Sequence, residues 1–239
     1  MASPDPSWSY GNAAQWVAAI ATLLAVIVAL FKEDIIRRFR RPILRISIKP
    51  GPPDCHKTWI TYQTQGTALT LVRTHRYYLR LWLKNEGAVR AEKVQVFAEK
   101  LWRRAADGSF NDVESFLPMN LRWSHSRTPD SPEIFADGIS PRMGKHCDLG
   151  HITHPKRAAE LNEWLSDVPH DKTILALDLE VAPNTQSHLL PPGVYRLDLR
   201  IAAANSKPVE TTLEITLTGE WHDRESTMLT DGIGVRLVN

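Results

Sequence analysis

The first clear pattern along the chain is an uncharged, mostly apolar run of nineteen residues, 13–31, followed at once by Lys32 and an arginine-rich segment. A helix of this length extends about 28 Å, close to the ~30 Å hydrocarbon thickness of a membrane. The pattern predicts a short tail at residues 1–12, a transmembrane helix at 13–31 and a basic juxtamembrane helix at 32–42, ending at Pro42. The residues that we expect to contact lipid headgroups are Arg37, Arg38, Arg40 and Arg41.

The charges on either side of this run indicate its orientation. Residues 1–12 contain no Lys or Arg, whereas residues 32–49 contain seven, against two acidic residues. A cleaved signal peptide has the opposite order, with a positive segment before a shorter apolar run. Because positive flanks stay on the cytoplasmic side, we expect a single-pass protein of the inner or plasma membrane with its N-terminus outside and its C-terminal domain in the cytoplasm.

Small residues recur along one stripe of the predicted transmembrane helix, at spacings of three and four. Small side chains at this spacing let two membrane helices approach closely, which favours a homodimer. The alternative is that alanine is simply common in such helices. The stripe consists of Ala14, Ala18, Ala21, Ala25 and Ala29.

From Ile43 onward, apolar and polar residues mostly alternate, which is typical of β-strands. One stretch, residues 155–168, instead has helical spacing and begins with a proline, so we expect a helix there. Many short strands with one connecting helix predict a mainly β fold, a β-sandwich over residues 43–239. The expected strands cover residues 43–48, 77–84, 94–99, 116–123, 147–152, 173–181, 193–203, 209–217 and 232–238.

Two patches resemble a known class of module. Residues 78–97 read as two strands joined by a turn at Asn85-Glu86-Gly87, and residues 191–200 contain a Gly-Val-Tyr-Arg-Leu strand. Both patches are similar to bacterial immunoglobulin-like modules of the CARDB type. The resemblance implies an immunoglobulin-like β-sandwich with a binding, adhesive or spacer role and no catalytic centre. The whole chain looks like the uncharacterised single-span membrane proteins of bacteria that carry such a domain.

Charge and cysteine content narrow the possible partners. The net charge is +2, and its basic excess lies beside the apolar run, where it serves membrane topology and anionic lipids. We therefore expect the lipid bilayer and a protein close to it as partners, and no nucleic acid. The two cysteines, Cys55 and Cys147, are expected to be free thiols in a cytoplasmic domain.

The densest group of metal-capable side chains is His146, Cys147, His151 and His154. Zinc sites use these residue types. However, strand alternation over residues 147–152 predicts that Cys147 and His151 share one face while His146 points to the other, so regular geometry does not bring them together. Surface histidines are the competing interpretation, and no cofactor is expected. Residues 138–145 resemble a phosphate-binding loop only superficially, because five residues separate the glycines where four are needed.

A last candidate surface contains Arg80, Trp82 and Lys84, which alternate with leucines and so share one face of a strand. An exposed aromatic between two cations suits protein binding, unless the helix at 155–168 covers it. We expect a membrane-anchored binding or scaffolding module without an evident catalytic centre. The alternatives are a metal-dependent hydrolase centred on Cys147 and His151, and an extracytoplasmic adhesion or assembly protein of the cell envelope.

Overall fold

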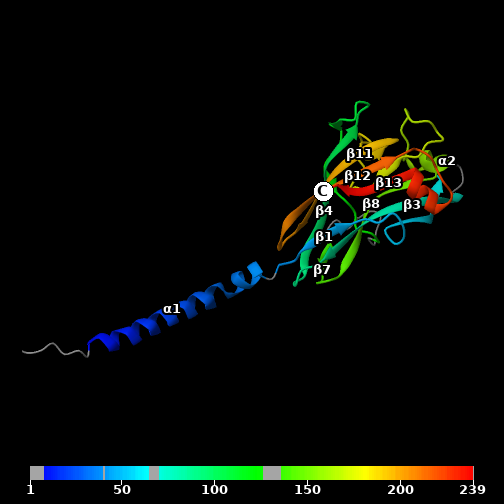
Figure 1. Ribbon diagram of the computed structural model, residues 1–239. Coiled ribbons are helices and arrows are strands. Elements are labelled where there is room, and N and C mark those ends of the chain that lie inside the picture. The colour runs from blue at the N-terminus through cyan, green and yellow to red at the C-terminus, as the bar shows by residue number, and fades with distance from the viewer. Residues whose placement is uncertain (1–7, 40, 65–69, 126–135, 239) are drawn as a thin grey trace, which may run out of the picture. The chain divides into compact units, whose positions relative to one another are not determined.

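The computed structural model describes residues 8–39, 41–64, 70–125 and 136–238 (Figure 1). The chain divides into two compact units, residues 1–41 and residues 42–239. The first contains one long helix and the second contains the β-strands.

Helix α1 (Trp8–Phe39) contains an apolar segment, Ala14–Glu33, with a mean hydropathy of 2.3 and no part of it buried against other residues. This confirms the prediction of an N-terminal helix long and apolar enough to cross a membrane. The one hydroxyl in its middle is satisfied locally, because Thr22 Oγ1 donates to the carbonyl oxygen of Ala18 at 2.8 Å. Such local pairing lets a polar side chain lie in an apolar environment.

The helix bounds differ slightly from those predicted. The helix already begins at Trp8, so residues 8–12 belong to it, because adding a residue to an existing helix costs far less than starting one. The basic segment continues the same helix to Phe39. Arg40 and residues 1–7 lie outside the described residues, as do the side chains of Arg37 and Arg38, while Arg41 is exposed. Headgroup contact by these arginines and dimerisation through the alanine stripe, whose members are exposed in the single chain, stay predictions.

The second unit contains two antiparallel sheets, which confirms the mainly β prediction. The first sheet has the strand order β1-β3-β8-β9-β10, with β2 also paired to β3. The second has the order β13-β12-β11-β4-β5, with β6 and β7 also paired to β4. The first sheet comprises β1 (Leu44–Ser47), β2 (Cys55–Thr64), β3 (Thr70–Asn85), β8 (Gly144–Thr153), β9 (Leu175–Leu177) and β10 (Leu189–Leu190). The second comprises β4 (Ala91–Arg104), β5 (Phe110–Asp112), β6 (Met119–Asn120), β7 (Ala136–Ile139), β11 (Gly193–Ala203), β12 (Ser206–Leu217) and β13 (Ile233–Val238).

The core lies between the two sheets. Alternate residues of β3, Leu79 and Leu81, are completely buried, and so is Leu197 of β11 in the facing sheet. Trp123, also completely buried, belongs to the same cluster. This is the arrangement that period-two patterning predicts, since one face of each strand is apolar and excludes water.

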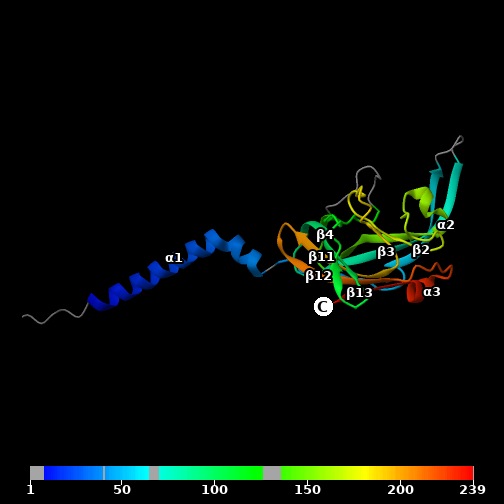
Figure 2. The same ribbon diagram turned by 90° about the horizontal axis from the view of Figure 1, so that it is seen from above.

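The outer parts of β2 and β3 form a two-stranded ribbon that projects from the rest of the β unit (Figure 2). Residues 70–75 of β3 pair with β2, while pairing with β8 begins only at Arg76. Strand β2 was not predicted, because the sequence Cys-His-Lys-Thr-Trp-Ile-Thr-Tyr-Gln-Thr lacks a clean alternation of apolar and polar residues. Its half-exposed position in the ribbon explains this, since neither face demands apolar side chains throughout.

The predicted helix over residues 155–168 is wrong in length. Helix α2 (Pro155–Ala158) is followed by the 3₁₀ turn η1 (Ala159–Leu161), where helical structure ends. Asn162 adopts a left-handed backbone with φ of 57°, a conformation that terminates helices. The apolar residues after it serve a small separate cluster, in which Trp164 and Leu165 pack against Val168. Two further short helical segments, α3 (Glu225–Thr227) and the π-helical η2 (Met228–Gly232), precede β13.

Candidate functional site

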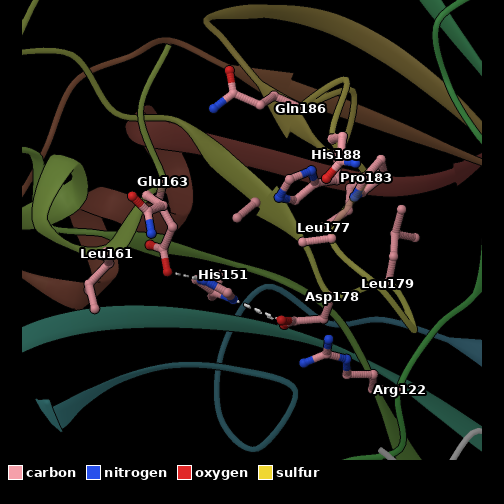
Figure 3. Close-up of a pocket in the computed structure, with 14 residues that line it drawn as sticks. Arg122, His151, Leu161, Glu163, Leu177, Asp178, Leu179, Pro183, Gln186 and His188 are labelled. Atoms are coloured by element: carbon pink, nitrogen blue, oxygen red, sulfur yellow. Dashed lines mark hydrogen bonds and ion pairs between the residues drawn. The ribbon is translucent and has the colours of Figure 1, made fainter. Parts of the chain in front are cut away.

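A pocket of about 500 Å³ lies beside the first sheet (Figure 3). Its walls come from β8, from β9 and the residues just after it, from the turn after η1, and from the loop before β10. Volumes of this size hold small organic ligands in proteins. The polar groups that line it include Arg122, His151, Glu163, Asp178 and His188.

His151 reaches this pocket because strand β8 contains a bulge. Arg80 of β3 pairs with Asp148 while the preceding Leu79 pairs with Gly150, so Leu149 is an extra residue on β8. A bulge shifts the alternation by one position. The predicted face assignment is therefore wrong: His151 points to the same side as His146 and Asp148, and Cys147 points to the opposite side, into the core.

The His151 ring lies between two carboxylates, as Figure 3 shows. Its Nδ1 is 3.0 and 3.1 Å from the two carboxylate oxygens of Asp178, and its Nε2 is 3.0 Å from Oε1 of Glu163. Asp178 directly follows β9, and Glu163 follows the left-handed residue that ends η1. The end of β9 thus positions Asp178 at Nδ1, and the end of η1 positions Glu163 at Nε2.

Burial and charge act in opposite directions on this group. Burial by itself lowers the pKa of His151, but the Asp178 carboxylate and the hydrogen bonds to both acids outweigh it and raise the pKa to about 9. For the two acids the directions are reversed. Burial raises the pKa of Asp178 and of Glu163, but the His151 cation outweighs it and leaves both pKa values below their ordinary range. At neutral pH the site is therefore an imidazolium between two carboxylates.

Glu163 has additional support from strand β3. The Nη2 of Arg76 donates to Oε1 of Glu163, and the Thr153 hydroxyl donates to its Oε2 at 2.5 Å. The Nε of Arg76 also donates to Thr153 Oγ1 at 2.9 Å. These bonds orient the Glu163 carboxylate, so that the acid–histidine–acid group is a fixed part of the pocket wall.

The pocket also contains polar atoms without a partner. The Nε of Arg122 and the Nδ1 of His188 are both buried and make no hydrogen bond within the described part of the chain. The Arg122 side chain donates from Nη2 to the carbonyl oxygen of Glu180 at 3.1 Å. Burial and then the His151 cation lower the pKa of His188, which leaves this second histidine neutral at pH 7.

The side chains that line this pocket are of kinds that bind ligands. A general base needs a free ring nitrogen near neutral pH; both nitrogens of His151 are bound to acids, whereas His188 retains an Nδ1 without a partner among the described residues. The lining residues of the pocket include no Ser, Thr, Cys, Lys or Tyr to act as a nucleophile. Asn162, Asn184 and Gln186 add neutral amides, and leucine, alanine and proline supply apolar wall. The lining thus suits binding.

The structure separates the four residues considered as metal ligands. Cys147 is buried in the core, where its thiol donates to the carbonyl oxygen of Arg122 at 3.2 Å. The Nε2 of His146 lies 3.0 Å from Asp54. His154 caps α2, accepting from the backbone N–H of Lys156 at 3.3 Å. Among the residues that the structure describes, no three His, Cys, Asp or Glu side chains form a group able to hold a metal ion.

Arg80, Trp82 and Lys84 do share one face of β3, but they differ in availability. Arg80 is mostly buried and donates from Nε to Asp148 at 3.0 Å. The Trp82 ring is partly buried, with its centroid 4.6 Å from that of His146. Lys84 is exposed. Their role in binding a protein stays a prediction.

Sequence reasoning found His151 but missed the residues that give it a role. Asp178 and Glu163 stand 27 and 12 positions from it, in segments without a recognisable motif. Neither Arg122 nor His188 belongs to a recognisable sequence motif. No family model, no curated protein and no solved structure matches this chain.

Proposed function

We propose that this chain is a single-pass membrane protein whose β unit is an immunoglobulin-like binding module with no catalytic centre. The apolar, unburied segment of α1 supports the anchor. The observation that carries the binding role is the pocket, in which His151 is bound at both nitrogens and neutral amides and apolar side chains supply much of the wall. The β unit would face the cytoplasm, since the basic residues follow the apolar segment.

Anchoring is tested by alkaline carbonate extraction of membranes from cells that express the full chain. The wild-type protein should stay in the membrane pellet. A variant with Leu23→Arg and Ile27→Arg should move to the soluble fraction, because each arginine at the centre of a membrane helix costs about 2.5–3.5 kcal/mol. A matched control, Ala106→Arg on the β unit, should stay in the pellet. Extraction of the wild-type protein would contradict the proposal.

Orientation is tested by labelling an introduced cysteine. The native Cys55 and Cys147 are 1% and 0% exposed, so they give little background. Ala106 is exposed, and Ala106→Cys should react with a membrane-impermeant maleimide only after the cells are opened. Labelling in intact cells would place the β unit outside the cytoplasm and would favour the envelope alternative.

The binding role is tested by thermal unfolding of the full chain in detergent with a set of small molecules, neutral and charged. Ala182 is an exposed lining residue, and Ala182→Trp should fill part of the pocket. We expect some compounds to raise the Tm of the wild-type protein and of Ala106→Trp, but not of Ala182→Trp. Binding shifts Tm by mass action, so a set with no such compound argues against a ligand pocket.

A further inference from the structure

Two polar side chains that line the pocket each have a buried atom without a hydrogen-bond partner among the described residues. Buried polar groups in proteins nearly always have a partner, and exceptions point to a missing ligand, water or ion. Arg122 Nε and His188 Nδ1 are such exceptions among the described residues. Both residues line the same pocket, one on each side of Asp178 in Figure 3. The Arg122 N–H can only donate, so its missing partner is an acceptor.

The charges around the pocket specify that acceptor further. Each of the two carboxylates is matched by a cation: Asp178 contacts His151, and Glu163 contacts both His151 and Arg76. Among the described residues Arg122 makes no ion pair within 4.0 Å, although its charge is close enough to help lower the pKa of Asp178. An arginine is always charged, and a partly buried charge without a counter-ion is costly. The lining cations and carboxylates balance, and Arg76, which supports Glu163 from outside the lining, brings the whole group to one net positive charge.

The size and the remaining walls favour a ligand larger than an inorganic ion. A cavity of about 500 Å³ is many times the ~30 Å³ that one water molecule occupies in the liquid. Leu161, Leu177, Leu179 and Pro183 supply apolar surface at the same site. A ligand that fits all of these features has an anionic head and an apolar body.

We propose that this pocket binds a small organic monoanion, with its carboxylate on Arg122, a second polar contact to His188 and its apolar body against the leucines. This proposal rests on the binding role proposed above and specifies the class of ligand. The acid–histidine–acid group acts as a neutralised wall, because His151 and Arg76 together balance the two carboxylates that would otherwise repel the anion.

The same geometry predicts proton uptake. The charged and titratable groups around His188 are His151, Glu163, Asp178 and Arg122, and burial followed by the two cations keeps it neutral in the empty pocket. A bound carboxylate adds an opposite charge, which favours the protonated ring. Affinity for a carboxylate should therefore rise as the pH falls from 8 to 6, whereas affinity for a neutral analogue should not.

The test is calorimetric titration of the full chain in non-ionic detergent with acetate, benzoate, phenylacetate and 3-phenylpropionate, and with phenylacetamide as the uncharged match. A charge-assisted hydrogen bond contributes about 1.5–3 kcal/mol, so phenylacetate should bind at least about tenfold more tightly than phenylacetamide. Arg122→Gln should lower the affinity for phenylacetate by a similar factor. The control Arg104→Gln, at an exposed position of β4, should leave it unchanged.

Each outcome decides the proposal. If Arg122→Gln unfolds, the comparison of phenylacetate with phenylacetamide in the wild-type protein still tests it. Equal affinity for the two compounds, or unchanged affinity in a folded Arg122→Gln, would overturn the anion assignment. So would the absence of saturable binding by all four carboxylates up to about 10 mM, a range that includes weak ligands. In each of these cases, neutral compounds that bind the wild-type protein but not the Ala182→Trp variant would still support the proposed binding role.

Discussion

The charge state of His151 makes the stability of the β unit depend on pH. The folded-state pKa of about 9 exceeds the ordinary value of 6.5. A group whose pKa is raised by folding stabilises the fold fully below its unfolded pKa and loses that contribution as the pH passes the folded pKa. At about 1.4 kcal/mol per pKa unit, the difference between these two pKa values corresponds to about 3 kcal/mol of stability. We expect the free energy of unfolding to fall by this amount between pH 6.5 and pH 9.

The assay is urea unfolding of the full chain in non-ionic detergent, followed by tryptophan fluorescence at several pH values. His151→Gln is the control, because it removes the titrating group and retains hydrogen-bonding capacity. It should be less stable than the wild-type protein by about 3 kcal/mol at pH 6.5, since two buried carboxylates lose their cation. The two proteins should converge toward pH 9. The raised pKa values of the two cysteines destabilise the fold only above pH 9 and affect both proteins equally.

Two observations would refute this reasoning. One is a wild-type stability that stays level from pH 6.5 to pH 9. The other is a His151→Gln protein whose stability falls in parallel with that of the wild-type protein, since the titrating group would then be elsewhere.

Three further predictions concern the packing of the β unit. Gly150→Ala should destabilise the fold by about 1–3 kcal/mol, because the new Cβ would lie 2.4 Å from the carbonyl oxygen of Ala176 on the paired strand. Gly234→Ala, whose Cβ would lie at an ordinary contact distance of 3.7 Å from the Cβ of Thr216, should cost less in the same urea titration. Trp123→Ala should cost about 3–5 kcal/mol through the cavity that it leaves in the core, and a loss below about 1 kcal/mol would contradict the burial of this side chain. Cys55 and Cys147 should not react with a thiol reagent at pH 8 until the protein is unfolded, since burial raises both pKa values; reaction in the folded state, measured by mass, would show that the thiols are accessible.

Sequence reasoning succeeded where a residue pattern reflects one physical constraint. The apolar helix follows from the absence of charge over residues 13–31. Strand β11, Gly193–Ala203, has the predicted bounds because its alternation matches burial at nearly every position. In both cases the environment acts on each residue independently of distant segments.

It failed where the structure depends on partners far along the chain. Leu161, Leu165 and Val168 have helical spacing, but Asn162 ends the helical turn and the later residues cover a small cluster of their own. The candidate site failed for a similar reason. His151 gains its charge from Asp178 and Glu163, whose proximity depends on a strand end and a turn that no periodic pattern reveals.

The extra residue Leu149 has a consequence for how substitutions in β8 should be designed. Odd-numbered positions before Leu149, such as Cys147, face the core. After Leu149 the alternation is reversed, so that His151 faces away from the core. Removing Leu149 would restore regular alternation without moving His151 to the other face, because Gly150 would still lie opposite Leu79 and His151 opposite Tyr78. The charged wall of the pocket should therefore survive the loss of this extra residue, but not the loss of one paired residue before His151, which would turn the imidazole toward the core.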